Sequence, residues 1–335
     1  MKIGMRLDEY RPPLVIMFFE MNPQTNHSGL ESCLHYLPPT GCLRLTGPDR
    51  VAFLQRQTTN DVTLLASNRA VTTVLTSPTG HILDVLQLFE DGETIGIVTL
   101  PDHAETTYTR LRRRIFFNDN VTLANASAET HIFDLEGEKA GDWLLEQGVE
   151  PPPLDGVVTG TLADAPVRVI GQPGLAGIGY RVLSGAPLLE LLVQAGIPAL
   201  TSEEHYILRV EAGIPAAGYE LTEDYTPHET SLDAWISETK GCYTGQEILA
   251  RQVTYDKITR HMAGLKLDVP VQPGAKVLAE DKPIGTITSA VNSPRLGPIA
   301  LAILKRPHHE PGTQVAVENE TGMTNATITA LPFPK

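Results

Sequence analysis

The last quarter of the chain is interrupted by proline and glycine so often that it leaves no room for a long helix. Between these residues lie six short runs that favour β-structure, at residues 261–268, 275–279, 284–290, 299–304, 314–317 and 325–331. Short strands separated by Pro/Gly turns are typical of a small barrel. We therefore predict a C-terminal β-barrel over residues 257–335.

Residues 22–256 combine strands and helices differently. Three apolar runs, at residues 70–75, 82–90 and 94–100, predict an antiparallel meander, and Asp91-Gly92 is a strong hairpin signal between the last two. The strands and helices that follow do not alternate regularly, which favours an α+β fold over a doubly wound parallel sheet. We expect two lobes in this region, divided near residues 125–155.

Charge and hydropathy exclude several classes of protein. A net charge of −14 argues against a general nucleic-acid binder, because such proteins need a basic surface. The arginines at positions 110 and 112–114 are a local exception, which we interpret as a solvated helix face or as arginines paired with carboxylates. The early apolar run at residues 14–19 is too short to span a bilayer, so we expect no membrane segment and interpret residues 1–21 as a leader outside the fold.

The three cysteines, Cys33, Cys42 and Cys242, form no Cys-x-x-Cys pair. This usage fits a reducing cytoplasm, and no Cys/His spacing predicts a metal site. Cys242 lies in the segment KGCYTGQE, residues 240–247. Thr244 and Glu247 have the spacing of a capping box before an apolar helical face, which predicts a helix from about Thr244.

Cys242 would then approach a helix N-terminus, where backbone amides favour an anion, with the positive charge of Lys240 nearby. Both effects stabilise a thiolate, so Cys242 is the candidate reactive thiol and Lys240 its activating neighbour. The alternative is that Cys242 is only a small buried apolar residue.

The KGCYTGQE segment, followed by Ala250-Arg251, resembles the signature of the YgfZ-type folate-binding proteins, relatives of the glycine-cleavage T-protein (aminomethyltransferase). Residues 58–61 (TTND) resemble a segment shared by both groups, and residues 208–213 (LRVEAG) resemble one whose arginine lies in the folate site. The resemblance covers residues 28–331. It implies folate-binding lobes over residues 22–256, with mixed antiparallel sheets, helices and a ferredoxin-like second lobe, before the terminal barrel.

The resemblance implies tetrahydrofolate, or a one-carbon derivative, as cofactor and Arg209 as its first contact. A planar guanidinium also suits a carboxylate or heteroaromatic edge on physical grounds, although Arg209 pairing with an acid such as Glu211 is the alternative. The further cofactor-binding candidates are Asn60, Asp61, Glu220 and Tyr243.

Two departures separate the chain from a true T-protein. The T-protein segment Thr-Gly-Glu-x-Gly-x-Glu corresponds here to residues 176–181 (AGIGYR), which contain neither glutamate. The activating aspartate of T-proteins follows an Asn-Ala pair, which is missing before Asp102, and Asp102 is better explained as a helix N-cap. Aminomethyl transfer would therefore lack its acid–base group.

Three hypotheses follow. The first is a folate-binding accessory protein that supports assembly or repair of iron–sulfur enzymes, including tRNA-modifying ones, through Cys242. Its partners would be those enzymes or assembly factors, with no direct nucleic-acid contact. The second is a folate-dependent aminomethyltransferase, and the third a scaffold that keeps the fold without a cofactor.

Overall fold

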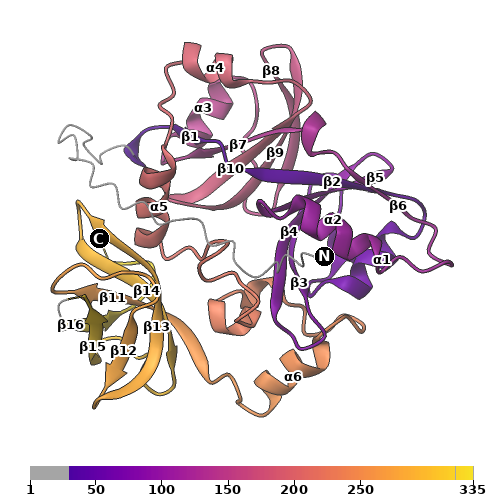
Figure 1. Cartoon of the computed structure of the whole chain (residues 1–335). Helices are drawn as coiled ribbons and strands as arrows, with labels where there is room; N and C mark the ends of the chain where they lie inside the picture. The colour runs from indigo at the N-terminus through magenta and orange to yellow at the C-terminus, as the bar shows by residue number, and fades with distance from the viewer. Residues whose placement is uncertain (1–29, 321, 335) are drawn as a thin grey trace, which may run out of the picture.

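The computed structural model describes residues 30–320 and 322–334, so the expected leader lies outside the described residues. Two five-stranded antiparallel sheets and a closed six-stranded barrel make up most of the described chain. The segment that joins α5 to α6 crosses the space between these three units (Figure 1).

The first sheet has the strand order β3-β4-β5-β2-β6. Its strands are β2 (Thr40–Thr46), β3 (Val71–Thr76), β4 (Ile82–Asp91), β5 (Thr94–Pro101) and β6 (Thr122–Asn125), with helices α1 (Arg50–Gln57) and α2 (Ala104–Arg112). Leu86 and Leu88 join the core that contains residues of both helices, whereas Phe89 on the other face belongs to a cluster shared with the second sheet. Both faces of β4 are therefore covered, and the predicted meander is confirmed.

The second sheet has the order β1-β7-β10-β9-β8. It is built from β1 (Leu34–Tyr36), β7 (His131–Glu136), β8 (Val157–Leu162), β9 (Ala165–Gly174) and β10 (Gly177–Ser184), with α3 (Ala140–Glu146) and α4 (Leu189–Gln194). Trp143 and Leu192 of these helices pack into its core. Val157, Ile170 and Leu183 pack instead against the first sheet, so the two sheets share an apolar layer.

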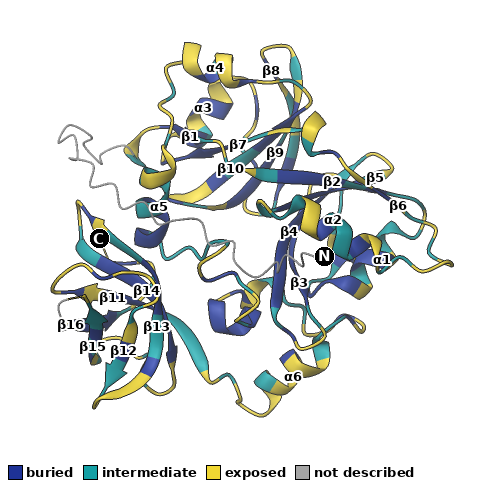
Figure 2. Cartoon of the chain, in the orientation of Figure 1, coloured by how far each residue is buried: buried dark blue, intermediate teal, exposed yellow. Residues whose placement is uncertain are grey.

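The barrel closes in the order β11-β14-β13-β12-β15-β16, and the predicted C-terminal barrel is confirmed. Its strands are β11 (Arg260–Leu267), β12 (Lys276–Ala279), β13 (Lys282–Ser293), β14 (Gly297–Lys305), β15 (Gln314–Asn319) and β16 (Gly322–Thr329). Helix α5 (Ser202–Glu211) packs on its outer wall, where Val210 meets Ile299 and Leu301. Figure 2 shows the buried residues concentrated in the sheets and the barrel wall.

Short 3₁₀ helices at Val62–Leu64, Ser127–Glu129, Pro227–Thr230 and Asp233–Trp235 lie in the connecting segments. No helix of residues 30–320 is long and apolar enough to cross a membrane.

Two predicted N-caps are wrong. Helix α6 (Gln246–Thr254) begins two residues after Thr244, and its N-cap is Gly245 in the left-handed region with φ +86°. Thr244 is held elsewhere, because its carbonyl accepts from Thr76 and its amide donates to the Arg56 carbonyl. Asp102 has φ +61°, and α2 begins after His103. Tertiary contacts override the local capping pattern in the KGCYTGQE segment.

Candidate functional site

A cavity of about 420 Å³ lies between the two sheets, helix α5 and the segment that follows it. This volume is within the range of small-molecule pockets. Part of its lining is aromatic: Tyr36 stacks on His205 with 3.9 Å between ring centroids. Burial lowers the pKa of His205 to about 4, so the ring is neutral at physiological pH. The cavity thus combines a flat aromatic wall with polar groups.

Glu136, at the end of β7, is a cavity-lining residue that our sequence analysis missed. Its side chain is buried, and its Oε2 accepts a hydrogen bond from the Leu175 amide at 2.8 Å. Gly174 and Gly179 make room for it, since a Cβ at either position would come within about 3.0 Å of a carboxylate oxygen. Burial raises the pKa of Glu136 to about 8. Near neutral pH this carboxyl is mostly protonated.

Asp134 lies two residues before Glu136 on the same strand and also lines the cavity. Its two carboxylate oxygens accept from Nε and Nη2 of Arg181 at 2.9 and 2.8 Å. Arg181 also donates to Gln87 at 3.4 Å. Residues 176–181 contain no glutamate. The neighbouring strand β7 supplies two carboxyl groups beside them, those of Asp134 and Glu136. The sequence signal for this pair was two acidic residues at alternate positions of one strand, which places both side chains on the same face of the sheet.

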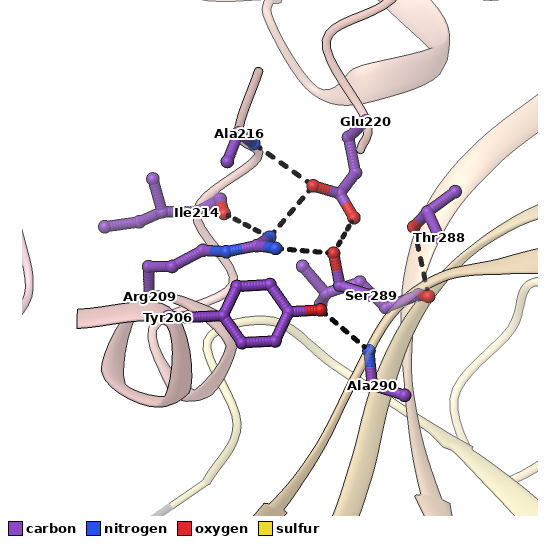
Figure 3. A network of polar contacts seen from close by, with 9 residues as sticks. Tyr206, Arg209, Ile214, Ala216, Glu220, Thr288, Ser289 and Ala290 are labelled. Atoms are coloured by element: carbon purple, nitrogen blue, oxygen red, sulfur yellow. Dashed lines mark hydrogen bonds and ion pairs between the residues drawn. The ribbon is translucent and has the colours of Figure 1, made fainter. Parts of the chain in front are cut away.

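Arg209 of α5 lines the same cavity but is only 2% exposed. Its Nη1 donates to Glu220 at 2.9 Å and its Nη2 to Ser289 of β13 at 2.6 Å (Figure 3). The guanidinium lies over the rings of Tyr206 and Tyr219, at 4.5 and 4.7 Å from their centroids. Its Nε is buried without a hydrogen-bond partner among the described residues.

The expected alternative for Arg209, an ion pair, is therefore present, with Glu220 as the acid. Glu211 instead accepts from Arg295 at 2.7 Å. The pair links α5, the following segment and the barrel across a water-excluded contact. Whether Arg209 also contacts a folate stays a prediction.

Lys240 joins the KGCYTGQE and TTND segments. Its Nζ donates to the carbonyls of Thr58 and Asn60 at 2.7 and 2.6 Å and lies 5.2 Å from the ring centroid of Tyr243. Burial lowers the pKa of Lys240 to about 8 and raises that of Tyr243 to about 12. The ammonium group is thus hydrogen-bonded to carbonyl oxygens of the neighbouring loop.

Local contacts occupy the side chains of Asn60 and Asp61. Asn60 donates to the Thr72 carbonyl at 2.8 Å, and Asp61 caps the 3₁₀ helix by accepting from the Thr63 amide at 3.0 Å. Neither is among the described residues that line the cavity. The structure brings Asn60, Lys240 and Tyr243 into one cluster and places Arg209 and Glu220 in another.

Cys242 is exposed, so the alternative of a buried apolar cysteine is wrong. Cys242 is not among the residues that line the cavity. The described residues contain no cluster of three or more potential metal ligands. Cys242 is therefore a surface residue outside the lining of the cavity.

Comparisons with known proteins agree with this architecture. Residues 260–335 match the glycine cleavage T-protein C-terminal barrel domain. An aminomethyltransferase of Chlorobium luteolum is 30% identical over 312 residues, covering 88% of this chain and 85% of that protein. The chain belongs to the aminomethyltransferase family. A further aminomethyltransferase, from Thermus thermophilus, is 31% identical and covers 86% of this chain and 82% of its own length.

A further relative is a chloroplastic protein of Arabidopsis thaliana that is named a putative transferase. It is 28% identical over 74% of this chain, which spans 59% of its length. The crystal structure of glycine cleavage system aminomethyltransferase T from Bartonella henselae matches with a TM-score of 0.80. At 21% identity, with 92% of this chain and 88% of that chain covered, it shows the aminomethyltransferase fold.

Proposed function

We propose that the chain binds a tetrahydrofolate derivative in the central cavity and presents Cys242 to iron–sulfur enzymes or their assembly factors, including tRNA-modifying enzymes. Its role is then that of a YgfZ-type accessory protein in cluster assembly or repair. The observation that carries this proposal is the separation of an exposed thiol from a cavity with aromatic and carboxyl groups.

The polar groups and the aromatic face of the cavity suit a reduced folate. A pterin ring is flat and carries N–H donors on one edge, for which Glu136 and Asp134 offer carboxyl oxygens and Tyr36 an aromatic face. Arg209 belongs to the same wall, where its guanidinium is paired with Glu220. When bound, tetrahydrofolate supplies a carrier for a one-carbon unit. The chain's own residues bind it, orient it and exclude water.

The position of Cys242 favours a macromolecular target. The thiol is exposed on a segment whose neighbours are fixed: Lys240 is bound to two carbonyls, and Thr244 to the first sheet. A rigidly presented surface thiol can reach an acceptor on another protein, whereas a ligand inside the cavity lies apart from it.

The test separates the two parts of the proposal. In anaerobic calorimetric titration with tetrahydrofolate, we expect saturable binding that Glu136→Gln weakens and Cys242→Ala leaves unchanged. In a deletion strain, Cys242→Ala should fail to restore iron–sulfur enzyme activity, with Thr239→Ala, an exposed neighbour, as the matched control. No binding at millimolar ligand would refute the folate site, and full complementation by Cys242→Ala would refute the role of the thiol.

Glu136 favours a second candidate, a folate-dependent aminomethyltransferase. A buried carboxyl that is protonated near neutral pH is a suitable proton donor. It would supply the acid–base group that residues 176–181 lack. Turnover with an aminomethylated lipoyl carrier and tetrahydrofolate, abolished by Glu136→Gln but not by Cys242→Ala, would establish this activity over the accessory role.

A further inference from the structure

Two adjacent phenylalanines are exposed in the loop between α2 and β6. Phe116 is 65% exposed and Phe117 is fully exposed, at 104%. Single exposed apolar residues are ordinary on protein surfaces, but neighbouring aromatic rings that share one loop tip are typical of binding sites. A fully exposed ring such as that of Phe117 has roughly 150–250 Å² to bury, and Phe116 has about two-thirds of that, so the pair supplies a substantial part of the ~800 Å² per partner of a standard interface.

Hydrogen bonds anchor the loop on both sides of the two rings. Asp119 accepts from the Phe116 amide at 2.9 Å and from Arg56 at 2.6 Å. Arg114 donates to Gln57 at 3.3 Å and to the Thr76 carbonyl at 3.4 Å. Because these contacts fix the backbone around the rings, little conformational entropy is lost when a partner covers them.

The same anchors position the segment that carries Cys242. Thr76, whose carbonyl binds Arg114, also donates through its hydroxyl to the Thr244 carbonyl at 2.6 Å. Arg56, whose guanidinium binds Asp119, accepts the Thr244 amide through its carbonyl at 3.2 Å. The aromatic loop and the segment that carries Cys242 are therefore anchored to the same two residues, Arg56 and Thr76.

Charge decides which partner fits. Arg112 and Arg113 at the base of the loop are exposed and make no ion pair with the described residues, on a chain of net charge −14. Two such arginines can neutralise only about two phosphates, too few for stable nucleic-acid binding at physiological salt. They suit instead an acidic rim around an apolar pocket.

We propose that the aromatic loop, residues 112–117, docks into an apolar pocket with an acidic rim on the protein that receives the chemistry of Cys242. The two phenylalanines enter the pocket, and the two arginines face the rim. This inference rests on the proposed accessory function and names the surface through which the client is recognised.

In-cell photo-crosslinking tests it, with p-benzoylphenylalanine placed at Phe117 and, as a control at an exposed apolar position on α4, at Val193. We expect position 117 to give a crosslink that mass spectrometry assigns to an acidic iron–sulfur enzyme or assembly factor. Arg112→Glu combined with Arg113→Glu should lower its yield about tenfold or more, because like charges would then face each other. A crosslink to a second copy, an RNase-sensitive adduct, or equal yields at both positions would overturn the proposal.

The double variant Phe116→Ala with Phe117→Ala separates this inference from the proposed function. It should keep the wild-type denaturation midpoint and folate affinity, because neither ring is buried, yet lose complementation. Full complementation by this variant, with none by Cys242→Ala, would reject the docking loop and retain the thiol's role. Full complementation by both would reject the proposed function itself.

Discussion

Replacement of Glu136 by glutamine tests the electrostatics of the cavity most directly. Glutamine keeps the shape of the side chain and one oxygen for the Leu175 amide, but it cannot ionise. In the wild type the folded protein holds a proton on Glu136 at pH values where the unfolded chain has already lost it. Stability should therefore fall as pH rises through this window, and the variant should lack that fall.

The size of the effect follows from the pKa. Burial raises the pKa of Glu136 from 4.5 to about 8. This interval is about 3.5 pH units, and at ~1.36 kcal/mol per unit it corresponds to about 5 kcal/mol. The free energy of unfolding of the wild type, minus that of the variant, should decrease by about this amount between pH 4 and pH 9, with most of the change between pH 5 and pH 8.

Urea denaturation followed by tryptophan fluorescence at single pH units provides the measurement. Glu146→Gln, at an exposed position on α3, is the matched control and should track the wild type. A Glu136→Gln profile parallel to the wild type within about 1 kcal/mol would show that the carboxyl is already ionised in the folded protein and would refute the reasoning.

The other predictions concern the clusters around the cavity and the thiol. Arg209→Met should cost about 3–5 kcal/mol in urea denaturation, because it leaves a buried carboxylate unpaired, and a loss below 1 kcal/mol would contradict this. Gly245→Ala should destabilise the protein by more than about 2 kcal/mol, since the new Cβ would lie 2.6 Å from a backbone oxygen. Gly92→Ala, also at positive φ but in open space, should cost only about 1 kcal/mol. Equal losses for the two variants would contradict the steric account. Cys242 should react with a thiol-specific disulfide reagent at least about tenfold faster than Cys33, whose burial raises its pKa to about 12, and comparable rates would contradict the exposed placement.

The parts of the fold that follow from local pattern were predictable. The barrel and the meander could be predicted, because turn residues and apolar runs mark each strand independently of the rest of the chain. The start of α6 could not be predicted, although Thr244 and Glu247 have the spacing of a capping box. The positive φ of Gly245 and the hydrogen bonds of Thr244 to distant residues decide that helix end. A capping box is a local preference that tertiary contacts can replace.

The candidate site shows the same limit. Arg209 was recognisable as a central residue, but its acid partner could only be found in space, since Glu220 reaches it across a loop and Ser289 comes from the barrel. Glu136 was missed because its importance depends on which strand pairs with β10. That register joins residues about 47 positions apart and leaves no mark in the local sequence.

The register also explains how the chain departs from the T-protein segment. Arg181, which ends the stretch corresponding to Thr-Gly-Glu-x-Gly-x-Glu, lies directly opposite Asp134 in the β10–β7 pair. A glutamate at this position would face a carboxylate across the strands, a pairing that is destabilising. With arginine there, Asp134 is neutralised by a bidentate ion pair, and Glu136 is left as the neighbouring carboxyl without an arginine partner. Arg181 on β10 and the acids on β7 therefore form one site, in which the strand paired with β10 supplies the carboxyl groups of the cavity.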